Sequence, residues 1–211
     1  MKNTTKAKKI IEILENEYPN ASTQLNFNNP FELLVATILS AQCTDVRVNI
    51  VTEKLFKKYI SLDDYINANL EEFEQDIFST GFYKAKAKNI LNTAKLIKDN
   101  FKGKVPDNME DLLTLSGVGR KTANCVLGNC FEIPGIVVDT HVLRLSNRIG
   151  FINTKDPDKA EFALYEVIPK SKWIIYNHII IEHGRKICKS QKPQCLNCKI
   201  NSFCDYFVKN N

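Results

Sequence analysis

The sequence predicts an all-α protein, and three observations support this prediction. Apolar residues recur at helical spacing in most segments of the 211-residue chain. Capping residues and Gly or Pro breaks separate these segments. No two segments alternate in a way that would pair them as strands, and the chain shows neither an internal repeat nor a low-complexity linker. At this length the chain can bury one large core or two small ones.

The first half of the chain predicts six helices. The N-terminal segment is Lys-rich and then amphipathic, with Ile10, Ile11 and Leu14 on its inner side. Pro30 opens a run that is nearly apolar all round, which predicts a buried helix. Thr44 can cap the helix that follows. The six predicted helices are 1–17, 31–42, 45–59, 62–68, 70–78 and 84–101.

The second half begins with two helices joined by a glycine turn. Asp107 followed by Glu110 predicts a capping box that opens the first of them. Gly117 and Gly119 then break the pattern, and an apolar stripe resumes at Ala123. Residues 133–138 are extended by composition, and further helices are predicted at 140–148, 157–168 and 172–183.

The glycine turn lies in the string Leu-Ser-Gly-Val-Gly-Arg-Lys-Thr-Ala at 115–123. The first amides of the following helix have no partner inside the helix, so they present donors to an anion. Arg120 and Lys121 fall in its first turn, where cations oppose the helix dipole. This placement predicts a polyanion outside, and phosphate is the obvious candidate. The alternative is a plain helical hairpin with solvated basic residues.

Together with Val-Val-Asp-Thr-His at 137–141, the string resembles the helix–hairpin–helix and catalytic segment of the endonuclease III family of DNA glycosylases. The resemblance extends over about 31–204, and Ser116 stands where the family usually has Pro. It implies two helical lobes with a cleft between them. The first is a six-helix barrel at 23–133 containing the helix–hairpin–helix at about 108–131. The second is an iron–sulfur domain formed by 1–22 and 134–211.

Lys121 and Asp139 are the candidate catalytic residues. The resemblance implies that Lys121 is the nucleophile and Asp139 its assistant. They lie 18 positions apart. A 12-residue helix is roughly 18 Å long and seven extended residues span about 23 Å, so the chain can return to the start of the helix. Alternatively, Asp139 is only an N-cap and Lys121 only a phosphate-binding surface lysine.

The chemistry requires such a pair. A neutral amine can attack C1′ of a damaged nucleotide, displace the base and form a Schiff base. The neighbouring C2′ proton then becomes acidic, and β-elimination breaks the strand on the 3′ side. Partial burial of Lys121, together with the charge of Arg120, would favour the neutral amine. Asp139 would take a proton from the amine or stabilise positive charge on the sugar.

Four cysteines near the C-terminus follow the spacing C-x6-C-x2-C-x5-C. They are Cys188, Cys195, Cys198 and Cys204. Four thiolates within 17 residues of a cytosolic protein predict a metal site rather than disulfides. The spacing alone leaves zinc and an iron–sulfur cluster open. The resemblance implies one 4Fe–4S cluster, because every gap matches the family's loop.

The charge distribution predicts a nucleic-acid contact. The chain carries a net charge of +5, and the last 29 residues carry all of this excess, with six cations against one acid. The candidate DNA-contacting residues are Gln42, Phe82, Gly117, Gly119, Arg120, His141, Lys189 and Lys192. By resemblance, Gln42 enters the space that the extruded base leaves and Phe82 wedges the opposite strand. Phe82 as a core aromatic and Gln42 as a helix C-cap are the alternatives.

These observations predict a bifunctional DNA glycosylase and abasic-site lyase that acts on oxidised pyrimidines. Its partner would be duplex DNA with damaged pyrimidines or abasic sites, and it would act as a monomer. The alternatives are an adenine-mismatch glycosylase and a non-catalytic DNA-binding protein with a structural metal loop. With no long apolar run and no signal-peptide pattern, we expect no membrane span, no targeting segment and a cytoplasmic location.

Overall fold

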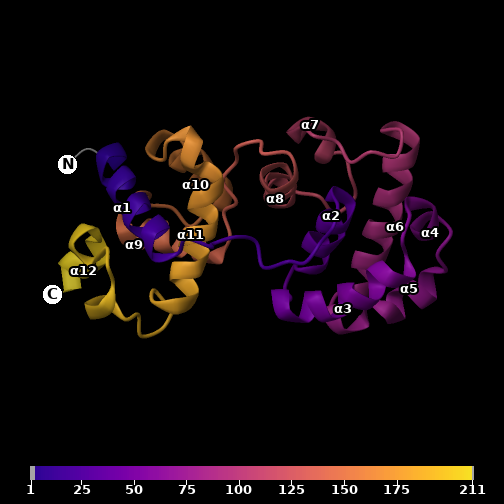
Figure 1. Cartoon of the computed structure of the whole chain (residues 1–211), viewed down its shortest axis with the longest axis horizontal. Coiled ribbons are helices and arrows are strands. Elements are labelled where there is room, and N and C mark those ends of the chain that lie inside the picture. The colour runs from indigo at the N-terminus through magenta and orange to yellow at the C-terminus, as the bar shows by residue number, and fades with distance from the viewer. Residues whose placement is uncertain (1–2, 211) are drawn as a thin grey trace. The chain divides into compact units, whose positions relative to one another are not determined.

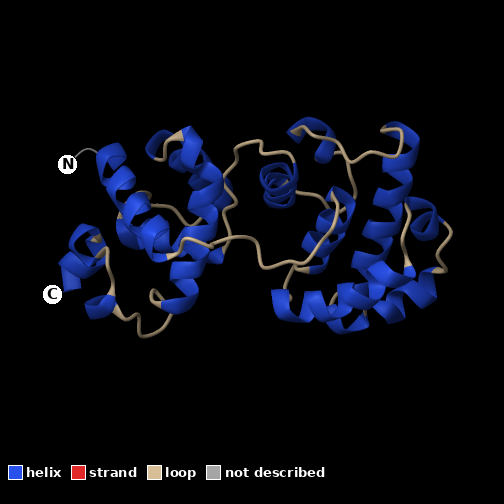
Figure 2. Cartoon of the chain, viewed as in Figure 1, coloured by secondary structure: helices blue, strands red, loops and turns tan. Residues whose placement is uncertain are grey.

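A computed structural model describes residues 3–210, which contain twelve α-helices and four short 3-10 helices. No strand occurs among the described residues, so the all-α prediction is confirmed (Figure 2). The chain divides into two compact units at 23/24 and 131/132. Unit 1 combines the N-terminal 23 residues with everything from Glu132 onward, and unit 2 is Gln24–Phe131 (Figure 1).

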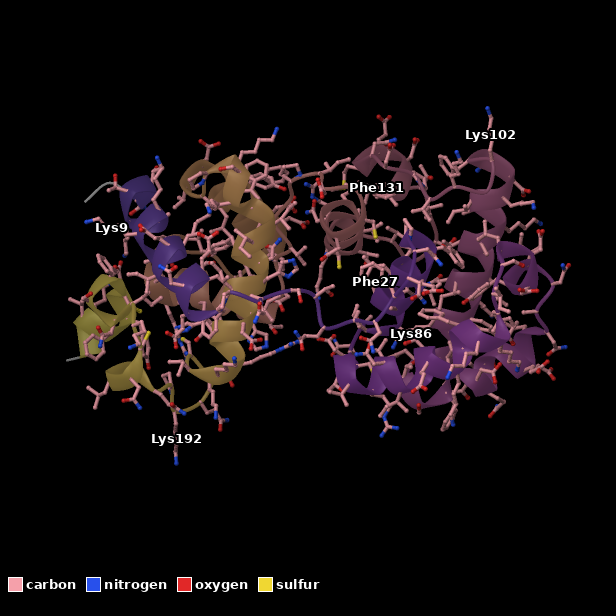
Figure 3. All side chains as sticks on the ribbon, viewed as in Figure 1. Lys9, Phe27, Lys86, Lys102, Phe131 and Lys192 are labelled. Atoms are coloured by element: carbon pink, nitrogen blue, oxygen red, sulfur yellow. The ribbon has the colours of Figure 1, made fainter. Side chains whose placement is uncertain are left out.

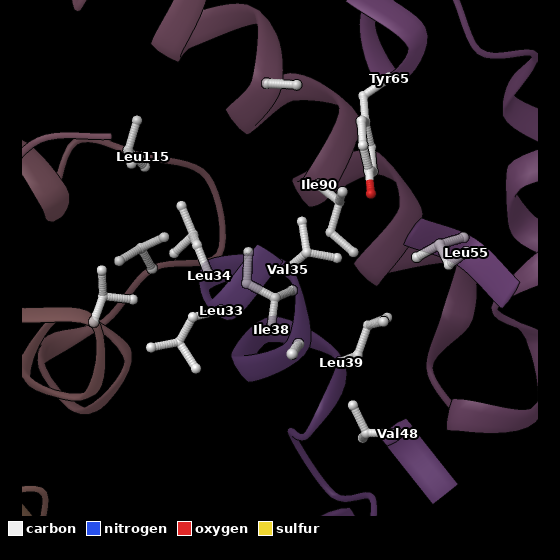
Figure 4. Packing of buried hydrophobic residues seen from close by; sticks show 14 of the residues in the cluster. Leu33, Leu34, Val35, Ile38, Leu39, Val48, Leu55, Tyr65, Ile90 and Leu115 are labelled. Atoms are coloured by element: carbon white, nitrogen blue, oxygen red, sulfur yellow. The ribbon is translucent and has the colours of Figure 1, made fainter. Parts of the chain in front are cut away.

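Unit 2 is built around α2 (Pro30–Leu39), which packs against α3, α6 and α8. Every residue of α2 from Leu33 to Leu39 is buried, because its sequence is apolar on all faces (Figure 4). The other elements of unit 2 are α3 (Asp45–Lys58), α4 (Leu62–Ile66), α5 (Leu70–Asp76), η1 (Phe78–Thr80), α6 (Tyr83–Asn100), α7 (Met109–Leu112) and α8 (Arg120–Cys130).

Side-chain caps set several helix starts in unit 2. Thr44 caps α3 as predicted, since its hydroxyl accepts a hydrogen bond from the backbone N–H of Arg47. The prediction that Asp107 opens the helix before the glycine turn is wrong by one residue. Asn108 adopts the extended backbone of an N-cap, and its side chain accepts from the N–H of Asp111.

Unit 1 contains the first helix and the last four, so segments from both ends of the chain share one core. Its elements are α1 (Asn3–Glu17), α9 (Thr140–Ile149), α10 (Pro157–Val167), η2 (Lys170–Lys172), α11 (Trp173–Lys186), η3 (Cys195–Asn197), η4 (Asn201–Phe203) and α12 (Asp205–Asn210). Helix α11 packs against both α1 and α9. The half-exposed carboxylate of Asp205 and the buried ammonium of Lys6, 2.6 Å apart, link α12 to α1.

Among residues 3–210, no helix is both long enough and apolar enough to cross a lipid bilayer.

Candidate active site

The glycine turn between α7 and α8 is held by one face of α6. The Thr93 hydroxyl donates to the Ser116 carbonyl at 2.9 Å, and the Asn92 amide contacts the Ser116 hydroxyl. Gly117 has φ +74°, and a Cβ there would lie 2.7 Å from the amide nitrogen of Asn89. The turn therefore needs glycine at 117 for two reasons: its backbone conformation and its close approach to α6.

Gly119 has different surroundings. It is the N-cap of α8, with φ −101°, a value that any residue can adopt. A Cβ at this position would meet nothing within 4 Å. No side chain caps α8 and no acid lies in its first turn, so the helix start presents its backbone donors beside an open surface.

Lys121 is exposed in the first turn of α8. The partial burial expected of it is not found, because its side chain leaves the helix on the solvent side of the buried stripe Ala123, Val126 and Leu127. Arg120, its neighbour, is half-buried. The structure thus places an exposed amine directly beside the uncapped helix start.

Asp139 caps α9 in unit 1. Its Oδ1 accepts a hydrogen bond from the Val142 N–H at 2.7 Å, so the N-cap role is present. The chain before it is extended and is tied to α11 by Asn177, which accepts from the Val137 N–H and donates to the Gly135 carbonyl. The backbone on both sides of the carboxylate is therefore fixed.

Lys121 belongs to unit 2 and Asp139 to unit 1. Each residue is positioned by its own unit, at the start of a helix. That the Lys121 amine lies close to the Asp139 carboxylate stays a prediction.

Gln42 and Phe82 lie on two exposed loops of unit 2. Phe82 is 73% exposed, so its alternative role as a core aromatic is wrong. Ser40 is the C-cap of α2, so the alternative of Gln42 as the cap is wrong too. Both residues have left-handed backbone, with φ +54° at Gln42 and +48° at Phe82. Such a conformation in a non-glycine residue is maintained only where the surrounding structure holds it.

The four C-terminal cysteines line a single cavity in unit 1. Burial raises the pKa of the Cys198 thiol to about 11, and the other three cysteines add to the rise. Thiolates gathered there need compensating positive charge, and a bound metal supplies it while releasing the protons. Fitting this requirement, Arg148 of α9 donates to Cys188 Sγ at 3.4 Å.

Sequence reasoning missed two residues beside this cavity. Arg148 also donates to the carbonyls of Lys189 and Ser190, so it holds the start of the cysteine loop. His183 is buried; its Nε2 lies 3.4 Å from Cys198 Sγ and its Nδ1 lies 2.9 Å from the Tyr18 hydroxyl. Nothing in the local sequence indicates this contact, because Tyr18 and His183 are 165 residues apart.

The remaining predicted DNA-contacting residues occupy unit 1. Lys189 and Lys192 are exposed on the cysteine loop, and Lys192 extends outward from it (Figure 3). His141 is half-buried, with its Nδ1 3.2 Å from the Arg144 guanidinium. Its ring packs against α11 at Gly184, where a Cβ would lie 2.5 Å from Nδ1.

Comparison with known proteins identifies relatives over almost the whole chain. Residues 35–170 match the family described as HhH-GPD superfamily base excision DNA repair protein. Endonuclease III of Bacillus subtilis (strain 168) is 47% identical over 188 residues, covering 89% of this chain and 86% of that protein. Endonuclease III of Escherichia coli (strain K12) is 39% identical over 207 residues, covering 98% of both chains.

A solved non-covalent endonuclease III–DNA complex is similar in structure, with a TM-score of 0.93 and 44% identity, covering 100% of this chain and 99% of that one. The chain therefore belongs to the endonuclease III family, bifunctional DNA glycosylases and abasic-site lyases within the HhH-GPD superfamily of base excision DNA repair proteins.

Proposed function

We propose that Lys121 is the nucleophile and Asp139 its assistant in the removal of oxidised pyrimidines from duplex DNA. The observation that carries this proposal is the start of α8, where an exposed primary amine follows a glycine turn and an uncapped row of backbone N–H groups. Those N–H groups suit a phosphate, and the amine one residue later suits the sugar attached to it.

The proposed reaction begins at the lysine amine. The Lys121 amine, having lost one proton, attacks C1′. The C1′–base bond breaks, and the departing base keeps the electron pair and is protonated. The nitrogen, now a secondary ammonium, loses a further proton and forms a double bond to C1′ while the C1′–O4′ bond breaks and O4′ takes up a proton. The product is an open-chain Schiff base, which acidifies the C2′ proton. Loss of that proton expels the 3′ phosphate by β-elimination, and water releases the lysine.

Asp139 assists through its carboxylate. Its Oδ1 accepts a hydrogen bond from the Val142 N–H, which orients the group, and Oδ2 lies outside this cap. The carboxylate accepts the amine proton and stabilises positive charge developing on the sugar. The likeness to a structure described as a trapped endonuclease III–DNA covalent intermediate, with a TM-score of 0.93 and 44% identity, supports a covalent route.

Duplex DNA is the proposed partner, and the two units contribute different contacts. In unit 2, the helix start at Gly119 and Arg120 binds phosphate next to the damaged nucleotide. Gln42 fills the space left by the extruded base, and the exposed ring of Phe82 wedges the opposite strand. In unit 1, basic side chains of the cysteine loop, Lys189 and Lys192 among them, contact the backbone. The proposed enzyme acts as a monomer in the cytoplasm.

We also propose that Cys188, Cys195, Cys198 and Cys204 hold a 4Fe–4S cluster. All four line one cavity, and their C-x6-C-x2-C-x5-C spacing matches the cluster loop of the family at every gap. Four cysteines can also hold zinc, and measuring the metal content of the purified protein distinguishes the two. The cluster would hold the basic loop in one shape; no step of the reaction passes through it.

Borohydride trapping tests the nucleophile. The wild-type holoprotein should form a covalent adduct with abasic-site duplex, and Lys121→Ala should form none while binding the duplex with similar affinity. Lys9→Ala, which removes an exposed lysine of α1, is the matched control and should trap normally (Figure 3). An adduct of undiminished yield in Lys121→Ala would exclude Lys121 as the nucleophile.

A panel of duplexes tests the substrate class. Release of oxidised pyrimidines with strand cleavage supports the proposal. Release of adenine opposite a damaged purine, without cleavage, would favour an adenine-mismatch glycosylase. Tight binding of every duplex without any product would favour a non-catalytic DNA-binding protein.

A further inference from the structure

Lys86 is a buried cation that the reaction does not use. It lies in the first turn of α6 and is 4% exposed (Figure 3). Its Nζ donates to two backbone carbonyls, those of Leu39 and Thr80, both at 2.8 Å. No carboxylate of the described residues forms an ion pair with it.

The two acceptors explain how the charge is tolerated. Leu39 is the last residue of α2 and Thr80 is the last residue of η1. Carbonyls at helix ends lack partners inside the helix and carry the negative end of its dipole. Burial lowers the pKa of Lys86, because desolvation disfavours its charged form, while the nearby Cys43 acts in the opposite direction.

These acceptors lie directly before the two loops that carry Gln42 and Phe82. Leu39 precedes Gln42 by three residues, and Thr80 precedes Phe82 by two. The backbone N–H of Lys86 also donates to the Phe82 carbonyl at 3.1 Å. One residue therefore contacts the base of the first loop, the base of the second loop and the tip of the second loop.

The contacts coincide with the left-handed residues of both loops. Gln42 and Phe82 are exposed, so few tertiary contacts of their own side chains can maintain their backbone. The hydrogen bonds of Lys86 supply part of that constraint from beneath. They also join segments that are 47 residues apart in sequence, so one side chain links the bases of both loops.

We propose that Lys86 is a positioning residue that couples the loops of Gln42 and Phe82, so that both side chains enter the duplex together when the damaged nucleotide is extruded. This inference rests on the roles proposed for Gln42 and Phe82. It assigns Lys86 no contact with DNA and no part in the bond-making steps.

The first test separates duplex opening from chemistry. Lys86→Met keeps the length and apolar stem of the side chain and removes its donors. We expect excision of an oxidised pyrimidine from duplex to fall about 10- to 100-fold, the effect of a small misplacement of catalytic or binding groups. Borohydride trapping on a single-stranded abasic oligonucleotide, which needs no opening, should stay within about twofold.

Lys95→Met is the matched control. It removes an exposed lysine from the same helix, so it repeats the loss of charge without touching the loops. Both activities should match wild type. If Lys86→Met lowers duplex excision and single-strand trapping equally, the residue acts through general stability and the inference fails.

A double-mutant cycle gives the sharper test. In wild type, Gln42→Ala and Phe82→Ala should have non-additive effects on duplex excision, because the two side chains act as a unit. In the Lys86→Met background the same effects should become additive. Non-additivity that persists unchanged in that background would overturn the coupling.

The cycle also separates this inference from the proposed function. If neither Gln42→Ala nor Phe82→Ala affects duplex excision in wild type, the roles proposed for those two side chains fail. If both matter and Lys86→Met changes nothing, only the inference about Lys86 fails. Should Lys86→Met not fold, Lys86→Gln, whose amide keeps two N–H donors on a shorter stem, replaces it in the same cycle.

Discussion

Gly117→Ala should lower the stability of the fold, whereas Gly119→Ala should lower the affinity for DNA, although only one residue separates the two glycines. At Gly117, a Cβ would lie 2.7 to 2.9 Å from three side-chain atoms of Asn89, and φ is +74°. Left-handed backbone costs a non-glycine residue about 1–2 kcal/mol. Moving Asn89 aside adds about 1–3 kcal/mol, as overpacking does elsewhere.

Some of this cost is offset, because alanine lowers the entropy of the unfolded chain by about 0.4–1 kcal/mol. The free energy of unfolding of Gly117→Ala should therefore fall by about 2–4 kcal/mol. For a chain of this size that corresponds to a fall in melting temperature of roughly 5–15 °C. Differential scanning calorimetry of the holoprotein measures it directly.

Gly119→Ala meets no neighbour within 4 Å and needs no unusual backbone. The entropic gain and the poorer N-cap nearly cancel, so stability should change by less than about 0.5 kcal/mol. The added methyl would instead keep a phosphate from the helix amides. Losing one such charge-assisted hydrogen bond costs about 1.5–3 kcal/mol, or about 10- to 100-fold in affinity.

Fluorescence anisotropy with abasic-site duplex measures that affinity at one fixed salt concentration. Wild-type binding by Gly119→Ala would refute the phosphate site at the start of α8. Wild-type stability of Gly117→Ala would refute the packing of the turn on α6.

Three further predictions concern unit 1. Asp139→Asn should keep the N-cap hydrogen bond and the melting temperature but lower turnover by about 100-fold or more. Asp139→Ala should in addition lower the free energy of unfolding by about 1 kcal/mol. If Asp139→Asn turns over as fast as wild type, Asp139 has no role in the reaction and acts only as the N-cap. Burial lowers the pKa of His178 from its usual value of 6.5. As the pH falls below 6.5, this histidine is therefore protonated in the unfolded chain before it is protonated in the folded one, and the folded state loses stability. His178→Gln should flatten that loss between pH 7 and pH 5 in urea titrations, and an unchanged slope would contradict the argument. Chelation of iron from the holoprotein should make the loop at 188–204 sensitive to protease, because Ile200 is the only buried residue that the structure describes in this loop. The control Cys130→Ala, which removes a cysteine outside the loop, should leave the protease sensitivity unchanged.

The fold class and most helix starts were predicted correctly from local sequence patterns. The all-α class followed from apolar spacing, and the caps at Thr44 and Asp139 followed from single residues next to that spacing. Even the error at Asp107 was small, because Asp107 and Asn108 are both good caps and only the backbone conformation selects between them. The cysteine spacing likewise located the proposed metal loop.

Other features depended on packing. Phe82 is as apolar as a core residue, and its exposure is decided by the left-handed start of α6. Lys86 is as polar as its exposed neighbours Lys84 and Lys88, and it is buried because the ends of α2 and η1 meet beneath α6.

By itself, the sequence determined the helices, the glycine hairpin, the candidate amine and carboxylate and the cysteine loop, because each depends on residues a few positions apart. Only the tertiary structure decided which cation is buried beneath the loops of Gln42 and Phe82 and which groups, Arg148 and His183, lie beside the cysteines. Contacts that span 47 or 165 residues leave no periodic trace in a sequence, since they arise when separate helices pack.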